Sequence, residues 1–231
     1  MWERVPYKQM TRIQLQQAEL TCVVDFVKPA FSFTDTPGRV FDFLIEALGE
    51  FGSTSNDLQF EEGEPEERGV ICLVDSLDAT VTVRGDRLEI EFSKFASTNA
   101  GEADGLLEKL KSGLTTLIVG QRLGMHSLTF DLHSEILDSA YKATLERLVP
   151  RPRVLPAATE SAIIYFLPEE PEKGYGESSV LFSRSDVIER GLQVSAILTY
   201  NGDVLKSTVI SAAWYRLLQL LRSLEFEYVE D

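Results

Sequence analysis

The most regular alternation of apolar and polar residues lies in the stretch 77–95. In its second half charged residues separate Leu88, Ile90 and Phe92, a period of two that is typical of a strand with one buried face. Residues 80–83 just before are β-branched throughout, which favours a strand. Gly85-Asp86 lies between, and a two-residue turn needs residues that accept a positive φ. The pattern predicts a β-hairpin, which needs further strands and a covering helix to be stable in water.

Apolar runs on both sides of this hairpin predict the rest of a first α+β unit. Residues 19–27 and 69–74 are predicted to form buried strands, with a shorter strand near Leu58. Thr36-Pro37 predicts the start of a helix and Gly52 its end; the inward side chains are Val40, Phe41, Leu44, Ile45 and Leu48. Asp104 is predicted to cap a second helix, whose buried side carries Leu106, Leu107, Leu110, Leu114, Leu117 and Ile118.

The same order of elements recurs after residue 124. Residues 127–136 predict a strand, and Asp138 is predicted to cap a helix with inward Tyr141, Leu145 and Leu148. The apolar run 161–167 predicts a buried strand. Further strands are predicted at 180–183 and 192–200, a hairpin turn at Asn201-Gly202 and a last helix at 208–224.

This recurrence predicts an α+β fold of two tandem units, each with the order strand, helix, antiparallel strands, helix. We expect residues 1–18 to form an N-terminal arm, 19–124 the first unit and 125–231 the second. The units are expected to pack pseudo-symmetrically and share a core, with the helices on one face of antiparallel sheet. In this alignment the Gly85-Asp86 turn matches Gly202-Asp203. The alternative is one irregular α+β domain in which the order recurs by coincidence.

Charge narrows the classes of partner. The 231 residues have a formal net charge of −15, whereas a hydrophobic fraction of 44% and a charged fraction of 26% are ordinary for a globular protein. A surface of this sign repels nucleic-acid phosphates and anionic lipids, so we expect neither a nucleic acid nor a membrane as partner. The acids are scattered along the chain, which indicates solubility rather than mimicry of a nucleic acid.

The cysteines and the N-terminal residues bear on the compartment. Cys22 and Cys72 lie in apolar, strand-like runs and are expected to be inert core thiols. The first residues carry charge where a signal peptide has an apolar run, and no stretch approaches the ~18 uncharged apolar residues of a membrane span. We therefore expect a cytoplasmic protein.

The polar residues best suited to chemistry lie on the strand predicted at 127–136. Asp131, His133 and Glu135 share one face of it, roughly 6.5–7 Å apart, and are the candidate catalytic or metal-binding residues. The alternative is a solvent-facing strand surface, because the sequence shows no converging groups from other elements. His126 falls on the apolar side and is expected to be a hydrogen-bonded structural histidine.

Motifs of the common catalytic and cofactor sites are missing from the sequence. It contains no GxxxxGK[ST], no GxGxxG after a strand, and no GxSxG, CxxC or HExxH. The acidic stretch 61–68 lacks the spacing of a calcium loop. Arg84-Gly85-Asp86 spells an adhesion tripeptide, but the hairpin turn explains it. We expect no cofactor and no bound metal, and the sequence favours a non-enzyme.

Two functional hypotheses follow. The first is a non-catalytic protein-binding module of the adaptor, chaperone, immunity or regulatory type, which offers a sheet edge or groove to another protein or to a second copy of itself. Its candidate aromatic contacts are Trp2, Tyr7, Tyr175 and Trp214, although helical spacing favours a core position for Trp214. The second is a small-molecule- or metal-binding protein, or a hydrolase, with its polar site on the strand 127–136 and Tyr165 or Tyr200 nearby.

Overall fold

The computed structural model describes residues 10–31, 37–64, 67–117, 122–137, 141–148, 162–201 and 208–229. The strands in these residues are β1 (Thr11–Phe26), β2 (Leu58–Glu61), β3 (Gly69–Val74), β4 (Ala79–Arg84), β5 (Arg87–Phe92), β6 (Leu123–Ile136), β7 (Ala162–Leu167), β8 (Ser178–Arg184), β9 (Gly191–Tyr200) and β10 (Phe226–Val229). The helices are α1 (Pro37–Leu48), α2 (Ala100–Leu117), α3 (Tyr141–Leu148) and α4 (Val209–Ser223).

These strands form one ten-stranded sheet in the order β2-β3-β4-β5-β1-β6-β9-β8-β7. β10 lies off this path and pairs in parallel with the beginning of β1, whereas the other pairings are antiparallel. The long strands β1 and β6 are neighbours in the middle, paired from Ile13 opposite Ile136 to Phe26 opposite Leu123. The predicted α+β class with an antiparallel sheet is confirmed.

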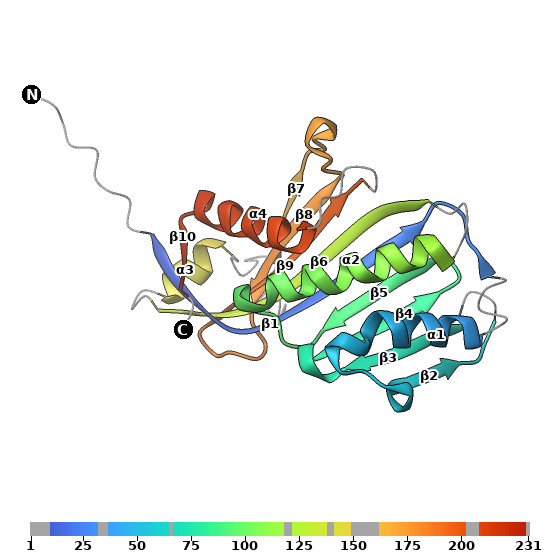
Figure 1. The fold of residues 1–231 in the computed structure, drawn as a ribbon. Helices are drawn as coiled ribbons and strands as arrows, with labels where there is room; N and C mark the ends of the chain where they lie inside the picture. The colour runs from blue at the N-terminus through green and yellow to red at the C-terminus, as the bar shows by residue number, and fades with distance from the viewer. Residues whose placement is uncertain are drawn as a thin grey trace, which may run out of the picture.

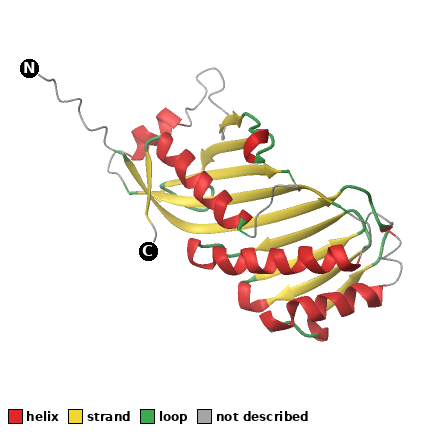
Figure 2. Cartoon of the chain, turned by 45° about the horizontal axis from the view of Figure 1, so that its top comes forward, coloured by secondary structure: helices red, strands yellow, loops and turns green. Residues whose placement is uncertain are grey.

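Helices α1, α2 and α4 cover one face of this sheet, called here the helix face (Figures 1 and 2). Alternate residues of each strand are buried beneath them, as Leu20, Cys22 and Val24 are in β1. The residues between these, such as Glu19 and Thr21, point to the opposite face. We call that side the open face, because none of the described helices covers it (Figure 2).

One apolar core fills the space between sheet and helices and includes residues of both halves of the chain. Near its middle the ring of Trp214 lies 5.4 Å from that of Phe95 and 5.7 Å from that of Phe130, centroid to centroid. Trp214 is only 4% exposed, which confirms its predicted core position. Both cysteines are free and buried, as predicted. Burial raises the pKa of the Cys22 thiol to about 12, so this thiol stays protonated and unreactive.

The predicted hairpin is confirmed, but the reason given for its glycine is wrong. β4 and β5 are joined by Gly85-Asp86, and neither residue has a positive φ. Gly85 is needed instead for close packing, because a Cβ there would lie 2.2 Å from the Phe31 ring and 3.0 Å from the Phe31 Cα. The Ala30 N–H also donates to the Gly85 carbonyl at 2.6 Å, which holds this segment against the turn.

The first strand begins at Thr11, so the part of the predicted N-terminal arm from Thr11 to Ala18 is strand. Its polar residues are compatible with a strand because β6 pairs with it on one side and β10 on the other, which satisfies the backbone whatever the side chains. Ile13 and Ala18 are buried, and the register shifts between Leu15 and Gln17. Pairing partners far along the chain, rather than local pattern, set this boundary.

Helix α1 is confirmed, but its buried face differs from the prediction. Phe43 and Ala47 are buried, whereas Ile45 is 39% exposed and Phe41 is half-buried. The helix packs on α2 as well as on β3, which turns Phe43 towards Gly113 of α2. Gly52 ends the segment with a φ of 86°, as predicted for a helix stop. The predicted N-cap Thr36 lies outside the described residues.

Asp104 is not the N-cap of its own helix, because α2 already begins at Ala100. Its buried carboxylate instead accepts hydrogen bonds at the start of α4, from the N–H of Ile210 at 2.7 Å and from the N–H of Ser211 at 3.0 Å. The Ser211 hydroxyl donates to the same carboxylate at 2.5 Å. Asp104 therefore caps a helix, but one from the other half of the sequence.

In the second half, the strands predicted at 127–136, 180–183 and 192–200 correspond to β6, β8 and β9, and the last helix to α4. Leu145 of α3 is buried and Tyr141 half-buried. The cap Asp138, the side chain of Leu148, and Gly202 of the predicted hairpin turn lie outside the described residues. The next described element after β9 is α4.

The strand predicted to be buried at 161–167 is present as β7, but it is exposed. Phe166 is 73% exposed, Ile164 51% and Tyr165 42%. β7 is exposed because it is the last strand in the sheet order and pairs with β8 alone among the described strands. An apolar run does not reveal whether a strand lies inside a sheet or at its edge.

Candidate functional site

Asp131, His133 and Glu135 lie on the open face of β6, between β1 and β9. The Asp131 carboxylate accepts hydrogen bonds from the side-chain amide of Gln193, at 3.0 and 3.2 Å. The Gln193 oxygen accepts in turn from the Ser183 hydroxyl at 2.9 Å. This carboxylate therefore belongs to a row of polar side chains that crosses three adjacent strands.

His133 is buried and bonds to the connection between β8 and β9. Its Nδ1 lies 2.8 Å from the Ser185 hydroxyl oxygen, which accepts hydrogen bonds from the N–H groups of Val187 and Ile188 at 3.2 and 2.9 Å. Because both lone pairs of that oxygen are occupied, the hydroxyl donates to Nδ1 and the imidazole carries its proton on Nε2. The contact orients the histidine and holds the connection in place.

The structure does not bring the three predicted residues to one point. Asp131 and His133 bond to different neighbours, and Glu135 lies opposite Gln14 of β1 and Gly191 of β9. Within the described residues, no group of three or more His, Cys, Asp or Glu side chains is arranged to hold a metal ion. Tyr165 and Tyr200 lie on the helix face, where Tyr165 packs on Phe182 at 5.9 Å between ring centroids and Tyr200 is 5% exposed.

His126 is fully buried on the helix face of β6, and its Nδ1 donates to the Gly124 carbonyl at 3.2 Å. This confirms the predicted structural histidine. Burial lowers the pKa of His126 to about 3, and the nearby Lys111 ammonium acts in the same direction. Its Nε2 has no hydrogen-bond partner in the described part of the chain. The imidazole is therefore neutral at physiological pH.

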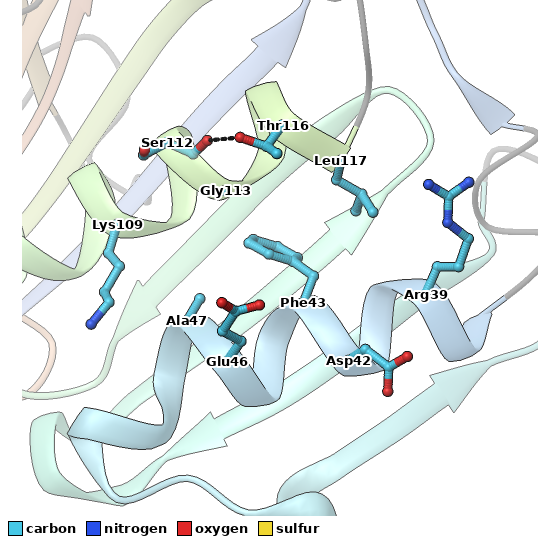
Figure 3. Close-up of a pocket in the computed structure, with 10 residues that line it drawn as sticks. All are labelled: Arg39, Asp42, Phe43, Glu46, Ala47, Lys109, Ser112, Gly113, Thr116 and Leu117. Atoms are coloured by element: carbon cyan, nitrogen blue, oxygen red, sulfur yellow. Dashed lines mark hydrogen bonds between the residues drawn. The ribbon is translucent and has the colours of Figure 1, made fainter.

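A groove of about 460 Å³ runs between α1 and α2 (Figure 3). The Phe43 ring forms its floor, and α1 contributes Arg39, Asp42 and Glu46. The polar side chains of the lining are exposed or half-buried and carry both signs of charge. Such a lining is typical of the solvated faces of two packed helices, so this groove offers no converging set of chemical groups.

β7 forms one edge of the sheet, at the end of the strand order (Figure 1). Exposed apolar side chains gather on the open face at this edge. Phe166 of β7 is opposite Ser179 of β8, which is opposite Ile197 of β9. Cross-strand neighbours share a face, so Ser179 lies between two large apolar side chains. We define the β7 patch as Ile164, Phe166, Ile197 and Met125, which are between 43% and 73% exposed.

A hollow of about 410 Å³ opens within this patch. Phe166, Ile197 and Met125 line it together with Ser179, Thr199 and residues of the loop before β8. Neighbouring strands are about 4.8 Å apart, so a small residue between two large ones leaves room for a side chain from outside. The hollow follows from the order large, small, large across three strands.

The loop beside the hollow is held rigidly. The Gly176 N–H donates to the Thr199 carbonyl at 3.0 Å, and a Cβ on Gly176 would lie 2.5 Å from the Thr199 hydroxyl oxygen. The buried Ser178 hydroxyl donates to the Gly176 carbonyl at 3.1 Å and accepts from the Thr199 N–H at 3.2 Å. The hollow is therefore formed before any ligand arrives.

Sequence reasoning did not identify this surface. Of the aromatic contacts that it proposed, Trp214 is in the core and Tyr175 packs between Tyr200, at 5.4 Å, and the Arg216 guanidinium, at 4.0 Å. Trp2 and Tyr7 lie outside the described residues. Phe166 lies in an apolar run that predicted a strand, but its exposure depends on the order of the strands in the sheet, which the run does not reveal.

Two further findings bear on function. None of the helices described is long and apolar enough to cross a membrane. No model of a protein family and no curated protein matches this chain.

Proposed function

We propose that this chain is a non-catalytic protein-binding module and that the β7 patch is its binding surface. The observation that carries the proposal is the exposure of Phe166, 73%, on a strand with an unpaired edge in the described residues and with three more exposed apolar side chains nearby. Contiguous apolar surface on a soluble protein marks interaction sites more often than scattered apolar residues do.

The recognition mode that fits this surface is the capture of an extended segment. The edge of β7 offers backbone N–H and C=O groups, which can pair with a strand from another chain. The hollow over Ser179 lies one strand in from that edge, so it accepts an apolar side chain where the segment continues past the paired residues onto the open face. Backbone pairing would supply affinity, and the hollow would supply specificity.

A peptide library displayed on phage tests this proposal. The full chain is immobilised, random peptides are selected on it, and the affinity of the selected peptide is measured by fluorescence polarisation. We expect Phe166→Ser to weaken binding at least tenfold, about 1.4 kcal/mol. Tyr215→Ser is the control, because it removes a similarly large side chain that is 59% exposed. Tyr215 belongs to α4, on the opposite side of the sheet from the patch, so its replacement should leave the affinity unchanged. Equal affinities for both variants, or a library that yields no binder, would reject the proposal.

We also propose that the fold consists of two tandem units. In support, β1 and β6 are central neighbours, each followed by a helix, antiparallel strands and a second helix, with β5 beside β1 and β9 beside β6. On this correspondence, the first unit begins with β1 and the Gly85-Asp86 turn matches the β8–β9 connection rather than Gly202-Asp203. The free, buried cysteines favour a reducing compartment, and we propose the cytoplasm.

A second candidate, a small-molecule- or metal-binding protein or hydrolase, has one contact in its favour, the hydrogen bond between Ser185 and His133. A thermal-shift screen with divalent metals and small metabolites tests it. This candidate predicts a rise in melting temperature for the wild type that is lost in His133→Ala. A screen without shifts, or with equal shifts in both proteins, rejects it.

A further inference from the structure

We infer that the segment bound at the β7 patch is basic: next to the apolar side chain that enters the hollow, it carries lysine or arginine. The inference rests on the proposed function and names the chemistry of the partner. The hollow has two glutamates in its lining, Glu169 and Glu177, and no lysine or arginine. Both are exposed and lie in the loop between β7 and β8.

These two carboxylates are not neutralised within the described part of the chain, where neither forms an ion pair. The neighbouring Glu170 differs, because it pairs with Lys173, which lowers the pKa of that carboxyl. The loop therefore presents two uncompensated negative charges beside an apolar hollow. A cationic group placed there would gain charge-assisted contacts that nothing in the free protein supplies.

The hollow itself also suits such a segment. Its apolar side chain would lie over Ser179, between Phe166 and Ile197, and the adaptable Met125 completes the lining. An arginine that follows could lay its guanidinium on the exposed Phe166 ring while it reaches a carboxylate. An apolar residue next to a basic one thus uses both features of the surface.

Charge also argues against a second copy as the occupant. The net charge of the chain is −15, and the sequence of β7, AIIYFL, contains no basic residue and is followed by Pro168 and Glu169. Pairing two β7 edges would offer the uncompensated carboxylates of either copy no cationic partner from the other copy's β7. The same field attracts basic segments from a distance and speeds their association.

The test uses the peptide selected on the full chain and a copy of it with each lysine and arginine replaced by glutamine. Affinities are measured by fluorescence polarisation at low and at high salt. The variant is Glu169→Gln with Glu177→Gln. Its control is Glu102→Gln with Glu108→Gln, two exposed acids of α2 whose replacement makes the same change in net charge.

We expect basic residues next to the apolar position in the selected peptides, and affinity about tenfold lower for the neutral copy. We expect a similar loss for the Glu169/Glu177 variant, a loss of less than threefold for the control, and weaker binding at high salt. Selected peptides without basic residues, or equal losses in both variants, would overturn the inference. So would a concentration-dependent dimer that Phe166→Ser dissolves.

The two possible failures are distinguishable. If Phe166→Ser abolishes binding while the charge changes have no effect, the β7 patch binds protein but the basic partner is wrong. If Phe166→Ser has no effect, both proposals fail.

Discussion

Asp104 lies on α2, yet its carboxylate serves the N-terminus of α4. The hydrogen bond to the Ile210 N–H spans 106 positions of the sequence. A carboxylate at this place satisfies N–H groups that no helix can satisfy itself, and its charge is favourable at the positive end of the helix dipole. The residue type indicated a cap, but the partner helix is set by tertiary packing.

Replacement of Asp104 by alanine is expected to destabilise the whole molecule. The variant leaves buried N–H groups of α4 without acceptors, so the free energy of unfolding should fall by about 2–3 kcal/mol. Urea unfolding measures this. Glu108→Ala, an exposed acid on the same helix, is the control and should change the free energy by less than about 0.5 kcal/mol. Equal effects would show that the cap contributes nothing.

A second single residue, His126, makes the stability of the protein depend on pH. The pKa of an unfolded histidine is about 6.5, while burial lowers the pKa of His126 to about 3 in the folded protein. Between about pH 3 and pH 6.5 the unfolded state binds a proton at His126 that the folded state does not bind. The stability that the neutral imidazole contributes is therefore fully present above about pH 6.5 and is lost as the pH falls towards 3. In this range the free energy of unfolding should fall by about 1.4 kcal/mol for each pH unit.

Urea unfolding of the wild type and of His126→Leu between pH 4 and 7 measures this contribution. The two proteins differ only at residue 126, so the difference between their profiles isolates the contribution of His126. We expect the wild-type profile to be steeper below pH 6.5. Parallel profiles would mean that the imidazole is not held neutral.

At the scale of elements, close approach decides how α1 and α2 pack. A Cβ on Gly113 would lie 2.2 Å from the Phe43 ring, so only glycine allows these two helices to meet as they do (Figure 3). Gly105, in the same helix, has nothing within 4 Å of an added Cβ. The two glycines make a matched pair in which the same substitution has opposite consequences.

We expect Gly113→Ala to lower the free energy of unfolding by about 1–3 kcal/mol, because the buried Phe43 ring must move. Gly105→Ala should raise it by about 0.5–1 kcal/mol, because alanine favours a helix and restricts the unfolded chain. Thermal unfolding of both variants measures the difference. Equal shifts of the same sign would contradict this account of the helix pair.

The strands and helices also show how much of the fold could be predicted from the sequence. Alternation along the strands identified β5 and β6, since one face of each meets the core and the period follows directly. It could not predict that β7 is exposed, that the glutamine-rich segment 14–17 is strand, or that Ile45 faces solvent, because these depend on which elements become neighbours. The polar face of β6 was predicted, but the partners of Asp131 and His133 on other strands were not.

At the scale of the whole molecule, the pairing of β1 with β6 joins the two halves into one sheet. A fragment ending at Gln121 loses β6, the contact between Asp104 and α4, and the Trp214 ring of the core. The edge of β1 and much apolar surface would then be exposed. We expect this fragment to aggregate or dimerise in size-exclusion chromatography. A monomeric, cooperatively folding fragment would show that the first half is stable alone.

The most direct test of the proposed binding surface is amide hydrogen exchange of the full chain, free and saturated with the selected peptide. The account predicts new protection in β7 and in the loop and strands around the hollow, with the α1–α2 groove unchanged. Protection at α1 and α2 or at β2, without change in β7, would contradict it.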